Sequence, residues 1–107
     1  MITRIWHGYA TPENADAYET ITKNETFVNI LKRNIPGFQE IQLYRRDGPA
    51  EVEFITIMWF KSLESVRTYA GENYEKAVVP PKAQTYLSRF DEVTRHYEVV
   101  TQVTGSN

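Results

Sequence analysis

The sequence of 107 residues contains no cysteine. A disulfide framework, a thiol nucleophile and a thiolate metal site are therefore excluded. The lack of disulfides is compatible with a cytoplasmic location, which is our expectation. Only two histidines are present, His7 and His96, and no third ligand stands at a spacing typical of zinc sites. We therefore expect neither a metal nor another cofactor.

Clustered charge and long apolar runs are also missing. The net charge is −2 and the basic residues are dispersed, whereas a nucleic-acid footprint needs clustered cations. No apolar run approaches the length of about 18 residues that a membrane span requires. The segment MITRIWHGYA lacks the apolar core of a secretory signal. We expect no nucleic-acid partner and no membrane partner.

What is present suits one small globular domain. Hydrophobic residues make up 41% of the chain and charged residues 24%, which is enough apolar material for a core. We expect a single domain over residues 1–103 and a disordered tail over residues 104–107.

The first half of the chain is expected to form a strand, a helix and a second strand. Residues 2–10 are rich in residues that favour strands, and they stop at TPEN, where Thr11 suits an N-cap and Pro12 the first helical position. Apolar residues then recur at helical spacing up to Pro36, which cannot continue a helix. A strand over residues 38–46 should follow, and the Asp-Gly of RDGPA predicts a hairpin turn.

The second half is expected to repeat this plan. A third strand covers residues 51–60, and Ser62 then caps a helix that runs to Tyr69 and ends at Gly71. The remaining elements are expected as a helical turn or two over residues 73–79, a short helix over 83–87 and a fourth strand over 92–103.

The order β-α-β-β-α-β predicts the α+β class and a ferredoxin-like βαββαβ fold with a four-stranded antiparallel sheet. Right-handed crossovers place the first and third strands in the centre, with the fourth strand antiparallel beside the first.

Both faces of this sheet are apolar. One face of the third strand carries Val52, Phe54, Thr56, Met58 and Phe60, and the other carries Ile55, Ile57 and Trp59. The helices can cover only one face, and the chain has little spare length to cover the second with coil. A second subunit is the simplest cover, so we predict a homodimer in which two sheets face each other.

Three segments carry a resemblance to a known family: IPGF at residues 35–38, MWFKSLESV at 58–66 and RHYEV at 95–99. They resemble the antibiotic-biosynthesis-monooxygenase-like domains of the dimeric α+β barrel superfamily, over residues 2 to about 100. That superfamily includes cofactor-free oxygenases of aromatic polyketides, heme-degrading oxygenases, isomerases and members with no known activity. The resemblance therefore implies a fold more strongly than a reaction.

The active residues of those oxygenases are mostly not matched here. Both groups place a Trp directly before a segment like KS. This chain has Phe60 there and Trp59 one residue earlier, on the opposite face of a strand. In the heme degraders the other functional residues are an Asn, which falls at Trp6, and a His, which falls near Val79. In the polyketide oxygenases they are an Asn, which falls near Thr56, and a Tyr, which falls near Val66.

The two histidines are the candidate catalytic residues. If the first and fourth strands pair antiparallel, His7 lies across from Arg95 or His96, and directly opposed residues share a face. Trp59 would then form a wall of that face. An imidazole there can hold or move a proton near neutral pH, so His7 or His96 would be the base. The alternative is that each histidine caps its own backbone neighbour or lies at the edge of the sheet.

The candidate substrate-binding residues are Arg4, Trp6, Trp59, Phe60, Tyr69 and Tyr97. Core packing explains the aromatic side chains on the helix-facing side as well as a pocket does. Arg4 is unusual for an inner strand. It either pairs with a carboxylate, for which Glu98 and Glu53 are candidates, or holds an anionic ligand, and we favour the ion pair.

The sequence therefore favours a homodimeric, cofactor-independent monooxygenase or isomerase-like enzyme on a small aromatic or enolisable substrate in an apolar cavity. In such chemistry the substrate carbanion reacts with oxygen, and the protein supplies a base and dry confinement. Arg4 or a Tyr would stabilise the enolate. The alternative is a non-catalytic homodimer that binds small molecules or other proteins, and a heme-degrading variant is a third hypothesis.

Overall fold

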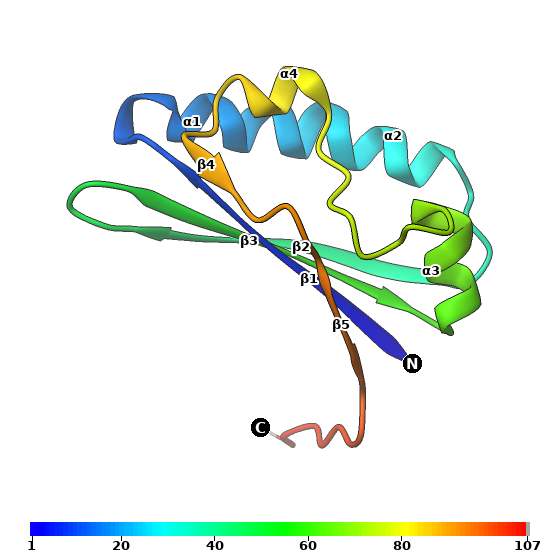
Figure 1. Cartoon of the computed structure of the whole chain (residues 1–107). Coiled ribbons are helices and arrows are strands. Elements are labelled where there is room, and N and C mark those ends of the chain that lie inside the picture. Colours follow the sequence, from blue (N-terminus) through cyan, green and yellow to red (C-terminus); the bar gives the residue numbers. More distant parts are fainter. Residues whose placement is uncertain (107) are drawn as a thin grey trace.

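A computed structural model describes residues 1–106 of the chain (Figure 1). The elements in chain order are β1 (Ile2–Ala10), α1 (Pro12–Ile21), the π-helical turn η1 (Thr22–Thr26), α2 (Phe27–Lys32), β2 (Phe38–Asp47), β3 (Val52–Phe60), α3 (Leu63–Ala70), α4 (Pro81–Gln84), β4 (Arg89–Phe90) and β5 (Arg95–Glu98). The predicted α+β class and ferredoxin-like order are confirmed.

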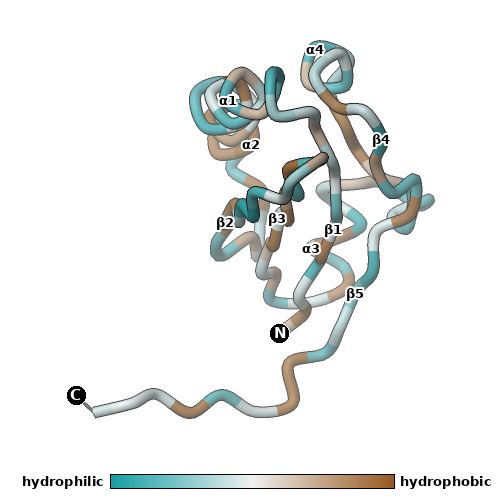
Figure 2. The backbone as a smooth tube through the Cα atoms, turned by 90° about the vertical axis from the view of Figure 1, so that its left-hand side faces the viewer, coloured by the Kyte–Doolittle hydropathy of each residue, from teal (hydrophilic) through white to brown (hydrophobic). Residues whose placement is uncertain are grey.

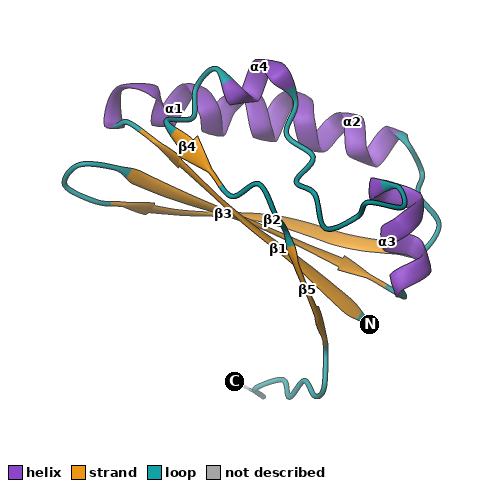
Figure 3. Ribbon diagram, in the orientation of Figure 1, coloured by secondary structure: helices purple, strands orange, loops and turns teal. Residues whose placement is uncertain are grey.

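The strands form one antiparallel sheet in the order β2-β3-β1-β4, with β5 also paired to β1. The two central strands are therefore β1 and β3, as predicted. Their register places Arg4 opposite Met58 and Trp6 opposite Thr56. Figure 3 shows all the helices on one side of this sheet. Alternate residues of β1 and β3 consequently face the helix layer, and the residues between them face the open side.

The prediction of one continuous fourth strand over residues 92–103 is wrong. Two short strands, β4 and β5, take its place, and residues 92–94 leave β1 between them. Ala77 N donates to Glu92 O at 2.8 Å and Thr94 N donates to Glu75 O at 2.7 Å, so this stretch pairs with residues 75–77 instead. Of the helical turn or two predicted over residues 73–79, only one turn forms, in which Lys76 N donates to Asn73 O at 3.1 Å. Lys76 then forms a β-type bridge with Val93, and the residues that follow are not helical.

A π-helical turn that the sequence does not predict interrupts the first helix. Its start at Pro12 and its end before Pro36 agree with prediction, and α1, η1 and α2 follow one another without a break. The middle turn, η1, is a π-helix, a rare geometry that often occurs at functional sites. The short helix predicted over residues 83–87 starts two residues earlier, at Pro81.

The core beneath the helices is divided into two clusters. One is built from Trp6, Ala10, Ala15, Tyr18, Val52, Phe54 and Ala83. The other is built from Ile30, Ile35, Met58, Phe60, Val66 and Tyr69. The boundary between the clusters crosses the middle of β1 and β3, which is where the candidate site lies.

The second face of the sheet has no cover from the chain's own helices. Ile55, Ile57 and Trp59 are only half-buried, whereas Phe54 and Phe60 on the helix side have no exposed surface. The chain after β5 runs away from the domain on the open side (Figure 2). Val100 and Val103 in that segment are 90% and 91% exposed, so they pack against nothing in this subunit. Residue 107 of the predicted tail lies outside the described residues.

No helix among residues 1–106 is both long enough and apolar enough to cross a bilayer.

Two glycines with positive φ test the fold. An alanine at Gly37 (φ +83°) would bring its Cβ into overlap with Ser65 Oγ and within 2.8 Å of Ser65 Cβ, whereas the space around Gly71 (φ +87°) is open. Gly71→Ala should lower the free energy of unfolding by about 1–2 kcal/mol through backbone strain alone. Gly37→Ala should lower it by about 2 kcal/mol more. Equal losses in urea denaturation would contradict the close contact of Gly37 with Ser65 of α3.

Candidate functional site

A small cavity lies between the long helix, the sheet and the segment that leads into α4. We call it the inner chamber, and its volume is about 50 Å³. Its walls are mainly apolar and aromatic, with a few polar groups. They are formed by Arg4, Trp6, Tyr18, Thr22, Thr26, Phe27, Ile30, Ile41, Thr56, Met58, Tyr69, Val78, Val79, Pro80, Ala83 and Thr94. A space of this size holds a few water molecules or one small chemical group.

A larger cleft adjoins the inner chamber on the side of the long helix. This outer cleft has a volume of about 340 Å³, and the two spaces share walls at Ile30, Tyr69 and Pro80. The volume of the cleft falls in the range of small-molecule sites. The two spaces are therefore neighbours, a larger cleft and a smaller chamber with common walls.

The π-helical turn lies directly over the inner chamber. Thr22 and Thr26, at its two ends, both line the chamber. Thr22 is buried, and its Oγ1 has no hydrogen-bond partner of good geometry within residues 1–106. The Tyr18 hydroxyl lies close by, and burial raises the pKa of that phenol. Interaction with the Thr22 hydroxyl opposes that rise, so the side chains of Tyr18 and Thr22 form a polar spot in the wall of the chamber.

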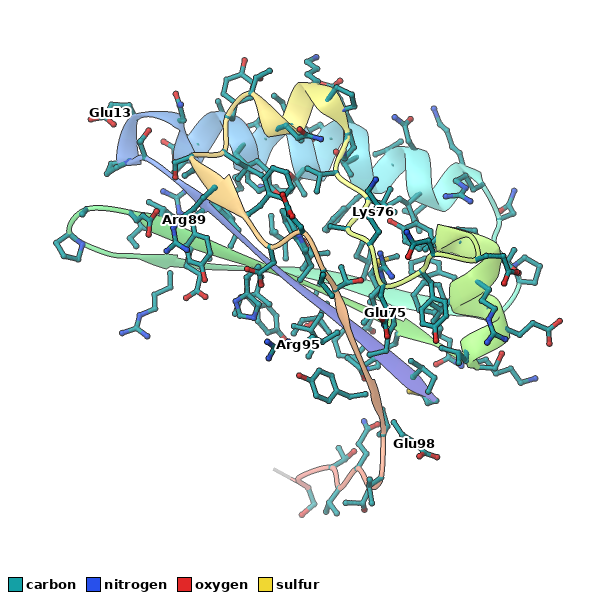
Figure 4. The ribbon with its side chains drawn as sticks, in the orientation of Figure 1. Glu13, Glu75, Lys76, Arg89, Arg95 and Glu98 are labelled. Atoms are coloured by element: carbon teal, nitrogen blue, oxygen red, sulfur yellow. The ribbon has the colours of Figure 1, made fainter. Side chains whose placement is uncertain are left out.

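Arg4 is the only charged side chain among those that line the inner chamber, and it is 3% exposed. Its Nη1 donates to Tyr74 O at 2.6 Å and to His96 Nε2 at 2.9 Å, and its Nη2 donates to Lys76 O at 3.4 Å. Figure 4 shows Lys76 on the segment that links α3 to α4, on the helix side of β1. Burial lowers the pKa of the guanidinium, which nevertheless stays charged at neutral pH.

The predicted ion pair of Arg4 with Glu98 or Glu53 is wrong. Glu98 is opposite Ile2 at the far end of β5, and Glu53 accepts a hydrogen bond from His7 on the open face. Within residues 1–106 no carboxylate lies within 4.0 Å of Arg4. Carbonyl dipoles and an imidazole surround this buried charge, but no negative charge does.

A second cation lies on the other side of Tyr69. The guanidinium carbons of Arg4 and Arg33 lie 5.3 Å and 5.2 Å from the centre of the Tyr69 ring. Arg33 borders the outer cleft, and its Nη2 donates to Tyr69 O at 3.1 Å. Burial raises the pKa of the Tyr69 phenol, although both cations oppose that shift. Arg33 and Lys82 therefore line the cleft and Arg4 lines the chamber, and the Tyr69 ring lies within cation–π distance of both arginines.

The ring of His96 supports Arg4 from the side opposite the chamber. A guanidinium can only donate, so His96 Nε2 accepts and the ring proton is on Nδ1. Burial, and then the charge of Arg4, lower the pKa of His96 to about 4. The ring also packs edge-on against Tyr74, at 5.2 Å between centroids. His96 is therefore neutral at pH 7 and holds the guanidinium in place.

The predicted pairing of His7 with His96 is wrong. His96 lies opposite Arg4 and its ring bonds to the Arg4 guanidinium, so it is on the helix side, whereas His7 alternates with the buried Trp6 and Gly8 and its ring is on the open side. His7 Nδ1 lies 2.8 Å from Glu53 Oε2. The prediction assumed one regular ladder, whereas the departure of residues 92–94 shifts the register between β4 and β5. The catalytic roles of both histidines stay predictions.

The candidate substrate-binding residues fall into two groups. Arg4, Trp6 and Tyr69 all line the inner chamber. Phe60 is fully buried behind Tyr69, at 5.7 Å between ring centroids. The remaining two, Trp59 and Tyr97, do not border it: Trp59 is on the open face, and Tyr97 is 48% exposed.

The long helix contributes polar groups to the inner chamber that were not among the predicted site residues. Tyr18 and Thr22 are four residues apart and hence on one helix face, which was a usable signal for a polar spot in an apolar stripe. Nothing in the sequence indicates that residues 78–80 line the inner chamber. Their path follows from the backbone hydrogen bonds of residues 75–77 to residues 92–94, which are distant in sequence. No group of three or more His, Asp or Glu side chains within residues 1–106 is placed to hold a metal ion.

No protein-family model matches the chain, and no curated protein matches it. Solved structures do. A Bacillus cereus protein named after the antibiotic biosynthesis monooxygenases matches with a TM-score of 0.69 at 9% identity, over 99% of this chain and 97% of that one. The monooxygenase from the gene ActVA-Orf6 of Streptomyces coelicolor, in complex with nanaomycin D, gives 0.70 at 11% identity, over 98% and 92%. This chain has the fold of the antibiotic biosynthesis monooxygenases.

A heme-degrading protein shares this monooxygenase fold. MhuD of Mycobacterium tuberculosis, solved with two hemes in its active site, matches with a TM-score of 0.59 at 19% identity, over 97% of this chain and 100% of that one. At such identities the likeness concerns the fold alone. The positions that the sequence resemblance marked at Trp6 and near Thr56 and Val79 all line the inner chamber, yet none carries the expected Asn or His.

The pKa of His96 provides a test of this site. Its value in the folded chain, about 4, is below the ordinary 6.5, so the unfolded chain takes up the proton first as the pH falls. Stability that is fully present above pH 6.5 is therefore lost between pH 6.5 and 4. Between pH 7.5 and 5, wild type should lose on the order of 1 kcal/mol more than His96→Gln, after allowance for solvent contact of the ring. Urea denaturation measures this loss.

The control for that experiment is His7→Gln, which removes the other imidazole and leaves Arg4 and His96 in place. It should retain the extra loss of stability below pH 6.5. An identical pH dependence in wild type and His96→Gln would show that the His96 ring is not held neutral against Arg4.

Proposed function

We propose that the protein is a small enzyme of the monooxygenase type that acts on an aromatic or enolisable substrate bound in the outer cleft and inner chamber. The observation that supports this most is the shape and lining of that space: a cleft with apolar and polar walls adjoins a mainly apolar chamber that contains a single buried guanidinium. Apolar walls orient a flat substrate, and one convergent polar group at the end fixes its reactive oxygen.

The volumes divide the substrate between the two spaces. The inner chamber, at about 50 Å³, accepts one oxygen-bearing group, and the outer cleft, at about 340 Å³, accepts a ring system. Arg4 then lies where it can stabilise negative charge on an enolate or phenolate oxygen. Burial excludes water from the same place, which strengthens this electrostatic interaction.

The proposed reaction needs no added reductant. A substrate methylene activated by an adjacent carbonyl loses a proton, and the resulting carbanion reduces oxygen. Removal of both C–H hydrogens and formation of a C=O bond supply four electrons, so one oxygen atom enters the product and the other leaves as water. The part of the protein would be to bind, orient and stabilise the anion, because neither His7 nor His96 lines the chamber.

Two of the structural neighbours support a flat ligand. The Streptomyces coelicolor protein is solved with nanaomycin D, and MhuD with two hemes. The monooxygenase fold therefore accommodates multi-ring ligands in those proteins, and Tyr69, the aromatic residue that lines the outer cleft, suits such a ligand here. For the same chain we retain a cytoplasmic location as a prediction.

We propose in addition that the protein is a homodimer closed over the open face of its sheet. Ile55, Ile57 and Trp59 form an apolar row on that face, which no helix of the same subunit covers (Figure 3). Val100 and Val103 extend beyond it with almost full exposure. A second copy would cover both features with one interface.

A non-catalytic protein that binds a small molecule is the second candidate function. The observation that favours it is the lack of a base: among the residues that line the inner chamber there is no His, Asp or Glu. The two candidates share a ligand site and differ only in turnover.

Oxygen uptake separates these two functions. With a panel of anthrones, cyclic 1,3-diketones and hydroquinones, the wild type should accelerate oxygen uptake for at least one compound without added metal, flavin or heme. Arg4→Met should lower that rate by about 10²-fold, because it removes the group that stabilises the oxyanion. The matched control is Arg46→Met, an exposed arginine on β2 away from the cleft. Saturable binding with no uptake for any compound would favour the binding protein.

The dimer is tested on the open face. Ile57→Lys places a charge in the middle of the apolar row and should convert a dimer into a monomer at micromolar concentration, with the fold retained. Thr20→Lys, on the exposed side of α1, adds the same charge and should remain dimeric. Analytical ultracentrifugation measures both. Wild type that sediments as a monomer at that concentration would refute the proposed assembly.

A further inference from the structure

We infer that the ligand of this site enters the inner chamber already ionised, as the anion of an aromatic acid, an acidic phenol or an enol, and that its negative oxygen pairs with Arg4. This inference rests on the proposed function, since it concerns the same site, and it specifies the chemical class of the ligand.

The charge of Arg4 is not compensated by a negative charge in the described structure. A guanidinium that is 3% exposed is costly to bury unless a negative charge or full hydrogen bonding offsets it. Within residues 1–106 no carboxylate pairs with it, and its Nε has no hydrogen-bond acceptor. Its Nη2 has only the long bond to Lys76 O. Arg4 lines the chamber, so donors remain there for an anion.

The outer cleft and the inner chamber both carry positive charge. Arg33 borders the outer cleft and faces the same Tyr69 ring as Arg4. The one carboxylate that lines the outer cleft, Glu25, accepts two hydrogen bonds from Lys82 at 3.0 Å. The cleft thus carries a neutralised pair and one further cation, and the chamber carries another cation. A ligand that moves inward meets net positive charge throughout.

Nothing in the inner chamber can ionise a neutral ligand. Its lining contains no His, Asp or Glu. Burial raises the pKa of Tyr18 and of Tyr69, so both phenols stay protonated and can donate but not abstract a proton. His96 reaches the chamber only through Arg4, to which its Nε2 is already bonded. A ligand that needs to be anionic in the chamber must therefore be anionic in solution.

Thr22 adds a second polar group to the chamber wall. Its buried Oγ1 has no partner of good geometry within residues 1–106, so rotation of this side chain would let it donate a second hydrogen bond to the oxygen that Arg4 holds. A carboxylate or a 1,3-dicarbonyl enolate has two acceptor positions and satisfies both groups.

The test uses two probes that differ in charge but share a ring system. 2-Hydroxy-1,4-naphthoquinone is ionised at neutral pH, and 2-methoxy-1,4-naphthoquinone cannot ionise. Titration calorimetry at pH 7.5 should show that wild type binds the hydroxy compound at least about tenfold more tightly than the ether. The visible absorption of the bound hydroxyquinone should be that of its anion. This reading needs no variant and hence does not depend on how a variant folds.

The variants locate the preference. Arg4→Met should abolish the difference between the two probes, whereas Arg46→Met should retain it. Equal or tighter binding of the ether by wild type would overturn the inference but leave the proposed small-molecule site intact. A failure of both probes to bind would overturn the inference and count against the proposed function as well. Retention of the preference in Arg4→Met would show that another group holds the anion.

Discussion

The structure of this protein is organised around a positive charge buried on its central strand. Alternation along β1 directs Arg4 into the helix layer, between two apolar clusters that would otherwise meet. A guanidinium at this point needs hydrogen-bond acceptors and space, and the surrounding chain provides both. The inner chamber, its narrow volume and the expected class of ligand all follow from the position of that one side chain.

The departure of residues 92–94 from the sheet is part of the same arrangement. By pairing with residues 75–77, this stretch holds in place the carbonyls of Tyr74 and Lys76 to which Arg4 donates. It also ends β4 and starts β5 in a register that puts His96 beside Arg4. Thr94 is buried here, and its hydroxyl donates to Tyr74 O and Glu75 O. A regular fourth strand would have left Arg4 without these partners.

Sequence reasoning succeeded where local chemistry determines the outcome. Pro12, the Asp-Gly turn, Ser62 and Gly71 each impose a boundary by themselves, and the apolar alternation of residues 52–60 determines which side chains face the helices. It failed where two distant segments decide together. No residue within 92–103 indicates that the strand would break, because the cause is the backbone of residues 75–77. The error in the histidine pairing followed directly, since a change of register changes the neighbour of every residue.

In the candidate site too, residue types could be predicted from the sequence but their partners could not. Arg4, Trp6 and Tyr69 were identified because their residue types are unusual or large on an inner face, and all three border the inner chamber. Whether Arg4 met a carboxylate could not be decided from sequence. Glu53 and Glu98 were both within reach by strand count, and the alternation of faces and the register of β5 put them elsewhere.

The most direct measurement of the central claim is a crystal structure of the protein soaked in iodide, an anion small enough for the inner chamber. This account requires an anomalous peak in the chamber within contact distance of the Arg4 guanidinium, opposite His96. An Arg4 already bonded to a carboxylate, with no iodide in the chamber, would contradict it.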